Sequence, residues 1–176
     1  MKVKVFLSWS GTTSKNLAKI FSKWLPLVLN STKPFYSAED IISGGRWNQA
    51  VANELEESKI GLLFLTKENL QAPWLMFEAG ALSKNIGGSK VCPILFGIKP
   101  TDIIGPLVQF QLAEFEESQI RKVLKMINRE LGDDNLETES FNTSFQMWWP
   151  QLKKDIDNVL STNNAQAFVP IRSDKE

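Results

Sequence analysis

The segment from Ala72 to Leu82 contains the side chain with the clearest capacity for chemistry. Glu78 is its only charged residue and lies four positions after Trp74, so both project from one face of the helix that this segment is expected to form. The small residues Ala79-Gly80-Ala81 would let a ligand approach closely. A carboxylate in apolar surroundings has a raised pKa and a desolvation cost that folding alone has no reason to tolerate. Glu78 is therefore either a solvent-facing residue of a buried helix or a functional carboxylate, and both interpretations stay open.

A second group of candidate residues lies between Ser37 and Trp47. It combines Glu39-Asp40 with the pair Gly44-Gly45 and with Arg46. A solvated loop followed by a helix cap would explain this composition. A mobile lid over a binding crevice would explain it equally well, with the glycines as hinges and Arg46 available to meet a phosphate.

The third group is Ser8-Trp9-Ser10-Gly11, which follows the first expected strand. Its hydroxyl and backbone N–H groups could bind an anion at a helix N-terminus, and Trp9 could stack on a flat ring. The group lacks the glycine patterns of nucleotide-binding loops, so it is a weak signal by itself. Cys92, within apolar strand sequence, is interpreted as a packing residue rather than a nucleophile.

The composition excludes several classes of site and partner. The chain has no histidine and a single cysteine, which removes Ser-His and Cys-His catalysis, His-ligated zinc and an internal disulfide. A lone cysteine also fits a reducing cytoplasm. The 20 basic residues balance the 20 acidic ones, and no apolar stretch is long enough to span a membrane. We therefore expect no metal site, no nucleic-acid partner and no membrane partner.

The elements that would position these residues follow from hydrophobic periodicity. Apolar runs bounded by turn residues predict strands at Val3–Ser8, Pro34–Ser37, Ile60–Leu65 and Val91–Phe96, with a fifth within residues 107–115. Apolar residues spaced by three and four predict helices at 17–28, 47–55, 73–84, 116–131 and 145–160. Pro26 is expected to kink the first helix or end it early, and Pro93 to place its strand toward a sheet edge or at a bulge.

This alternation of strands and helices predicts the α/β class. We expect one domain, residues 1–161, built on an open parallel sheet of about five strands with helices on both faces. A loose polar tail is expected at residues 162–176. Ligands bind such sheets at the carboxyl ends of the strands. Because all three candidate groups follow strands, we expect them to meet at that edge.

Taken together, these features resemble a known family. The strand ending in Phe6-Leu7-Ser8-Trp9-Ser10, the Glu39-Asp40 loop and, most specifically, Trp74-Leu75-Met76-Phe77-Glu78 are similar to the bacterial branch of the TIR (Toll/interleukin-1 receptor) domains. The resemblance is good over residues 3–97 and weaker to about residue 160. It implies a flavodoxin-like sheet in a cytoplasmic protein, and a family in which many bacterial members hydrolyse or cyclise NAD, often in defence against phage.

Carried over by position, the resemblance implies a role for each group. Glu78 is the expected catalytic glutamate. The residues expected to contact the substrate are Trp74, Trp9, Ser10, Asp40, Arg46 and Trp47. The loop expected to move on activation contains Ser43, Gly44 and Gly45. The Pro-Gly turn common in the animal adaptor members is absent from this loop, which argues against receptor–adaptor signalling through it.

NAD is thus the expected substrate, and no cofactor is expected. The nicotinamide ring of NAD carries a positive charge and leaves as a neutral molecule, so one carboxylate that stabilises the oxocarbenium-like transition state is sufficient. The products would be nicotinamide with ADP-ribose or a cyclic isomer. The resemblance also implies self-association through TIR–TIR contacts, and leaves room for an upstream sensor or downstream effector protein. Two alternatives stay open: a non-catalytic TIR scaffold and a nucleoside deoxyribosyltransferase-like enzyme.

Overall fold

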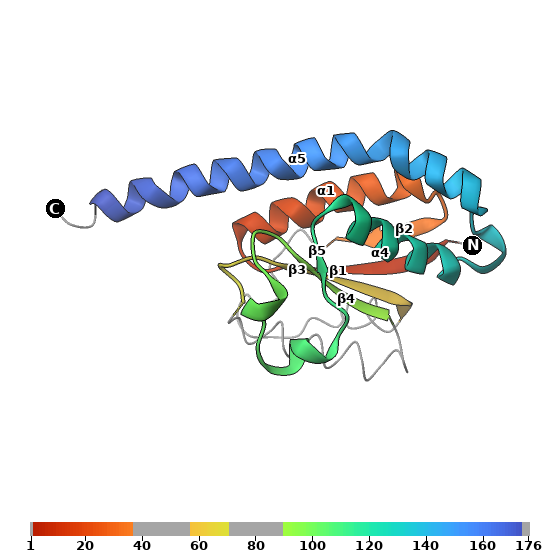
Figure 1. Ribbon diagram of the computed structural model, residues 1–176, viewed down its shortest axis with the longest axis horizontal. Helices are drawn as coiled ribbons and strands as arrows, with labels where there is room; N and C mark the ends of the chain where they lie inside the picture. The colour runs from red at the N-terminus through yellow and green to blue at the C-terminus, as the bar shows by residue number, and fades with distance from the viewer. Residues whose placement is uncertain (1, 37–56, 71–89, 174–176) are drawn as a thin grey trace.

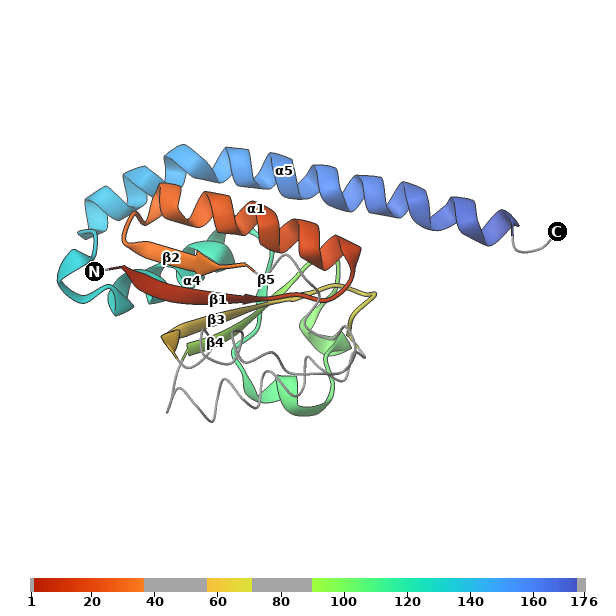
Figure 2. The ribbon, with the colours of Figure 1, turned by 180° about the vertical axis from the view of Figure 1, so that it is seen from behind.

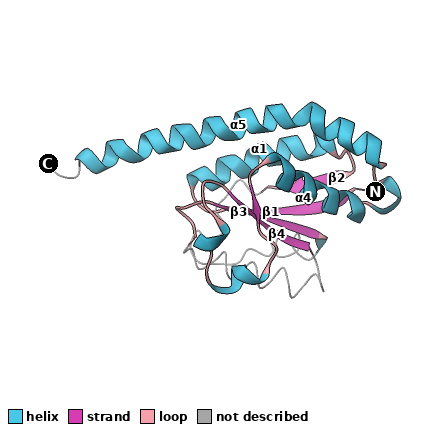
Figure 3. Ribbon diagram, viewed as in Figure 1, coloured by secondary structure: helices cyan, strands magenta, loops and turns pink. Residues whose placement is uncertain are grey.

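The computed structural model describes residues 2–36, 57–70 and 90–173, and the statements below concern these residues. They contain a five-stranded sheet in the order β2-β1-β3-β4-β5, with every pair of neighbours parallel (Figure 1). The strands are β1 (Val3–Ser8), β2 (Thr32–Phe35), β3 (Ile60–Leu65), β4 (Lys90–Leu95) and β5 (Ala113–Glu114). Helices lie over this sheet (Figure 3). The predicted α/β class with a five-stranded open parallel sheet is confirmed.

Strands β1 and β3 have the predicted bounds. Strand β2 begins before the predicted Pro34 because the buried Thr32 already pairs with Val3. The Thr32 hydroxyl also donates a hydrogen bond to the carbonyl of Leu29 at 2.7 Å, which fixes the turn that enters this strand. Strand β4 is shifted by one residue toward the N-terminus relative to the predicted Val91–Phe96, at both of its ends.

Strand β5 is much shorter than the predicted range 107–115. A 3₁₀ helix, η3 (Gly105–Gln109), takes the first part of that range, and Pro106 lies in its first turn, where a missing backbone N–H costs no helical hydrogen bond. β5 pairs with β4 only at Ile94 and Leu95. The fifth strand is therefore present at the predicted place but covers two residues.

Strand β4 lies next to the short edge strand β5, which agrees with the prediction that Pro93 places its strand toward a sheet edge. The Leu95 carbonyl accepts a hydrogen bond from Phe115 on the β5 side, whereas Phe96 donates to Leu65 on the β3 side. Because backbone groups alternate along a strand, Pro93 faces the β5 side, where β5 has not yet begun. Its missing N–H therefore removes no hydrogen bond from the ladder.

The first helix, α1 (Thr12–Val28), starts earlier than its apolar face predicts. It contains Pro26 but continues past it to Val28, so this proline does not end the helix early. A proline this close to the helix end removes a backbone hydrogen bond from the last turn only.

Two further helices follow β5. Helix α4 (Glu117–Glu130) agrees with its prediction to within one residue at each end. Helix α5 (Thr138–Ser173) is much longer than the predicted 145–160, and it continues through most of the tail that was expected to be loose. A helix that is already anchored by packing needs no new nucleus to extend into this stretch. Figure 1 shows this end of α5 projecting well past the sheet.

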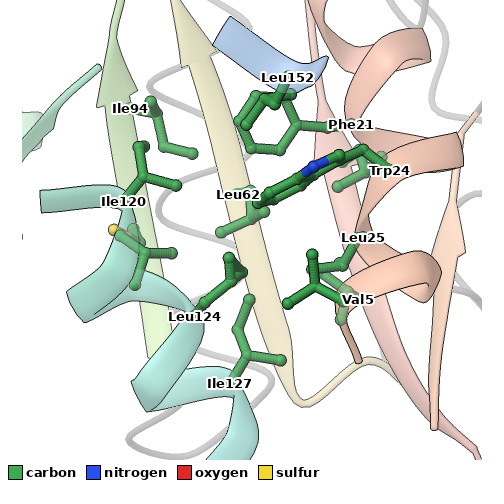
Figure 4. Packing of buried hydrophobic residues seen from close by; sticks show 14 of the residues in the cluster. Val5, Phe21, Trp24, Leu25, Leu62, Ile94, Ile120, Leu124, Ile127 and Leu152 are labelled. Carbon is green, nitrogen blue, oxygen red and sulfur yellow. The ribbon is translucent and has the colours of Figure 1, made fainter. Parts of the chain in front are cut away.

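One face of the sheet is covered by α1, α4 and α5 (Figure 2). Alternate strand residues such as Val5, Leu62 and Ile94 point to this side and pack against the helices (Figure 4). Trp24 of α1, predicted to be a core residue, is buried here, and its Nε1 donates to the Trp148 carbonyl of α5 at 2.8 Å. This contact ties the first helix of the chain to the last.

The intervening strand residues point to the opposite face and form a second apolar cluster. Its buried members are Phe6, Leu63, Leu65, Val91, Leu95, Ile98, Ile103 and Leu107. A sheet that is apolar on both faces is the arrangement predicted from its continuous apolar strands.

The helices predicted at 47–55 and 73–84 fall outside the described residues. Within the described part of the chain, no helix combines the length and the apolar character needed to cross a membrane.

Candidate functional site

The carboxyl ends of β1 and β3 form the part of the predicted site that the structure describes. The two strands pair in parallel up to Ser8 and Leu63, after which the β1 chain turns through Trp9-Ser10-Gly11 into α1. Gly11 takes φ +88° and ψ 162°, a backbone conformation that residues with a Cβ rarely adopt. This glycine therefore permits the abrupt change from strand to helix.

Ser14, in the first turn of α1, joins this turn to β3. Its side chain is fully buried. The Ser14 hydroxyl donates to the Phe64 carbonyl at 2.9 Å and accepts from the backbone N–H of Ser10 at 3.2 Å. The hydroxyl thus satisfies two backbone groups that the sheet leaves without strand partners.

Asn69 makes a second connection from the turn that follows β3. Its side-chain amide donates to the carbonyls of Ser10 at 3.1 Å and Phe64 at 3.0 Å. Its amide oxygen accepts from the backbone N–H of Thr66 at 2.9 Å. With the residue 4% exposed, these contacts are shielded from water and hold the two loops firmly together.

Two polar side chains complete this end of the sheet. The Thr13 hydroxyl donates to the Glu68 carboxylate at 3.0 Å, which connects α1 directly to the turn after β3. The Thr66 hydroxyl oxygen is buried and has no hydrogen-bond partner among the described residues. The polar groups therefore concentrate at the sheet edge where an α/β fold binds its ligands.

Trp9 is placed in the core rather than on the surface. It is 2% exposed, and its ring lies 6.1 Å from the ring of Tyr36, between ring centroids. The Lys15 ammonium lies 5.6 Å from the Trp9 ring centroid, within the range of a cation–π contact. Desolvation by burial raises the pKa of the Tyr36 phenol above its ordinary value. A contact between Trp9 and substrate stays a prediction.

The predicted site residues divide into two sets. Trp9 and Ser10 are described, and the structure brings them together with the end of β3. The remaining predicted residues lie outside the described residues: Asp40, Ser43, Gly44, Gly45, Arg46, Trp47, Trp74 and Glu78. Their roles stay predictions.

Sequence reasoning did not identify Ser14 or Asn69 as candidate residues. Ser14 lies shortly after the Ser8–Gly11 group, among residues typical of a helix start, so its contact with β3 is not visible in the sequence. Asn69 lies between β3 and the Trp74–Glu78 segment, and this position is the sequence feature that could have suggested a role. Its burial is visible only in the structure. Its partner Ser10 is distant in sequence, so only the fold brings the two together.

A pocket of about 730 Å³ lies away from this edge, beside β4, β5 and α4. Cys92 lines it but is only 6% exposed, and burial raises the pKa of its thiol to about 12. A thiol held neutral in this way is a poor nucleophile. The interpretation of Cys92 as a packing residue is confirmed.

Among the described residues, no group of acidic or cysteine side chains is arranged to hold a metal ion.

Comparison with known proteins provides the family. A metazoan TIR-STING receptor from C. gigas, solved in complex with 2′,3′-cGAMP, is similar to 73% of this chain at 19% identity with a TM-score of 0.48. The chain spans only 39% of that receptor chain. No curated protein matches the sequence. The family model of the TIR domain matches residues 5–124, which is more than half of the chain. The chain therefore belongs to the TIR domain family.

Proposed function

We propose that this TIR domain cleaves the bond between nicotinamide and ribose in NAD, with Glu78 as the catalytic carboxylate. The observation that carries the proposal is the Trp74-x-x-x-Glu78 motif, whose glutamate is the only charged residue of an apolar segment in a chain of this family. The described geometry is compatible with it. The turn after β3, which leads into that segment, is bonded to the loop that contains Ser10.

The proposed chemistry needs only one carboxylate. The C–N bond breaks with its electron pair passing to the nicotinamide ring nitrogen, so the positively charged ring leaves neutral and needs no proton. The Glu78 carboxylate stabilises the positive charge that develops on the ribosyl group. Water then attacks, loses a proton and gives ADP-ribose, or an internal nucleophile of the ADP-ribosyl group gives a cyclic isomer. NAD is the substrate, and no resident cofactor takes part.

The proposed surroundings of the reacting bond follow from the family resemblance. The substrate contacts are assigned to Trp74, Trp9, Ser10, Asp40, Arg46 and Trp47, and the gating loop to Ser43, Gly44 and Gly45. The chain would act in the cytoplasm, in bacterial defence against phage, with self-association through TIR–TIR contacts. Residues 1–161 would form the catalytic domain and residues 162–176 a tail outside it.

Nicotinamide release is the direct test. Purified protein is incubated with NAD across a range of concentrations and with a crowding agent, since activity is expected to depend on self-association. Glu78→Gln keeps the shape of the side chain but removes its charge, and should abolish release. Glu57→Gln is the matched control, because Glu57 is an exposed carboxylate that precedes β3 and pairs with Lys4.

The outcomes separate the alternatives. No release by the wild-type protein under any assembly condition would overturn the enzyme proposal and favour a scaffold. Equal release from Glu78→Gln would overturn the assignment of the site while leaving the reaction in place. A preference for deoxynucleosides over NAD would favour a deoxyribosyltransferase-like activity instead.

A further inference from the structure

We propose that Asn69 is a positioning residue for the nucleotide site. Its side chain fixes the backbone of the Trp9-Ser10-Gly11 loop in the conformation that receives the substrate. The inference rests on the proposed function, in which this loop contacts NAD. It adds a residue that no sequence motif singles out and assigns it a role through Ser10 rather than through direct contact with the substrate.

The backbone of Ser10 is held on both of its polar groups by side chains from other elements. Its N–H donates to the Ser14 hydroxyl at 3.2 Å, and its carbonyl accepts from the Asn69 amide at 3.1 Å. Neither partner belongs to a strand. The backbone of Ser10 is thus positioned by two side chains and not by the sheet ladder.

The sheet ladder cannot perform this task at this position. Pairing of β1 with β3 ends at Ser8 and Leu63, so the Phe64 carbonyl lies beyond the last paired residue. Asn69 and Ser14 both donate to that carbonyl, at 3.0 Å and 2.9 Å. The same amide group of Asn69 therefore bonds the end of one strand and the loop that leaves the other.

Asparagine suits this role because its side chain both donates and accepts. The amide nitrogen serves two carbonyls, while the oxygen accepts from the Thr66 N–H at 2.9 Å. Alanine would remove all three hydrogen bonds. Aspartate would keep the acceptor for Thr66 but would place a carboxylate against the carbonyls of Ser10 and Phe64.

Asn128 provides a matched control within the same chain. Its amide nitrogen donates to the Leu136 carbonyl and its oxygen accepts from the Leu136 N–H, both at 2.8 Å. It thus has the same kind of backbone-bonding role, between α4 and the segment that precedes α5. The end of α4 shares a pocket with Val3, which is the first residue of β1 and lies at the opposite end of this strand from Ser10.

The experiment compares steady-state NAD cleavage by wild type, Asn69→Ala, Asn69→Asp and Asn128→Ala at a temperature where circular dichroism shows each protein folded. Both Asn69 variants should raise the KM for NAD about tenfold, the order expected when a positioning contact is lost, with kcat changed less than about twofold. The dissociation constant of ADP-ribose, measured by calorimetry, should rise in parallel. Asn128→Ala should leave KM, kcat and this dissociation constant unchanged.

Each result decides the inference. An unchanged KM and an unchanged ADP-ribose affinity in the Asn69 variants would overturn it while the proposed function stands. Equal losses in Asn128→Ala would reduce Asn69 to a general stabilising residue. If Asn69→Ala does not fold, Asn69→Asp decides the question, because it keeps the bond from Thr66. A wild type that binds ADP-ribose without cleaving NAD still tests Asn69 by affinity. A wild type that does neither overturns both proposals.

Discussion

Replacing Trp9 by alanine should cost this domain a large part of its stability. The side chain is 2% exposed, so nearly all of the 150–250 Å² that an aromatic residue typically buries is removed from water here. At about 25 cal/mol per Å² this burial corresponds to about 4–6 kcal/mol. Aromatic-to-alanine changes in cores lose about 3–5 kcal/mol, and we expect a loss in that range.

Urea unfolding followed by far-ultraviolet circular dichroism measures this loss. Lys15→Gln serves as the control, because it removes the cation 5.6 Å from the ring centroid and leaves the ring in place. Its expected cost is at most about 1 kcal/mol. Trp9→Phe, which keeps an aromatic ring in the core, should fall between the two.

A small loss would contradict the buried position of this ring. If Trp9→Ala changed the free energy of unfolding by less than about 1 kcal/mol, the side chain would not be a core residue in solution. A ring free of the core would then be available to stack on the substrate. The stability of this variant therefore tests the packing role of Trp9, and the contact with NAD that its position in the family implies stays a separate prediction.

Two further predictions concern single residues. Gly11→Ala should destabilise the domain by about 1–3 kcal/mol through backbone strain at φ +88°. An added Cβ meets no atom within 4 Å, so a steric clash does not contribute to this loss. An unchanged urea midpoint would show that the loop relaxes freely. Cys92 should resist iodoacetamide at pH 8 in the native state and react fully in urea, since burial raises its pKa from 9.0 to about 12. Burial of the neutral thiol stabilises the folded state below pH 9.0, and this contribution is lost as the pH rises toward about 12. Cys92→Ala should therefore reduce the loss of stability with rising alkaline pH. An unchanged slope of the free energy of unfolding against pH would contradict the raised pKa of Cys92.

The central strands could be predicted because local sequence determines them. Ile60 to Leu65 is a continuous apolar run, and it forms β3 with those bounds. The ends of other elements depend on contacts that the sequence does not display. Helix α5 begins at Thr138 rather than near Phe145, because Phe141 is also buried and stacks on Phe145 at a centroid distance of 6.1 Å.

The polar surroundings of Ser10 could be located from the sequence, but their hydrogen bonds could not, and the site itself stays a prediction. The rule that ligands bind at the carboxyl ends of strands directed attention to Ser10, and polar groups do gather there. The contacts of Ser14 and Asn69 could not be predicted, because each depends on strand register that brings distant residues together. Trp9 shows the reverse case, since a position just after a strand suggested an accessible ring and the tertiary packing buries it.

The central claim is that the Glu78 carboxylate acts on the bond between nicotinamide and ribose. A structure of the assembled protein with a non-cleavable NAD analogue tests this claim most directly. The account predicts the Glu78 carboxylate beside the nicotinamide ribose, within hydrogen-bonding distance of its hydroxyl groups, and the analogue in contact with the loop that contains Ser10. An analogue bound at another surface, or a Glu78 side chain directed away from the ribose, would contradict it.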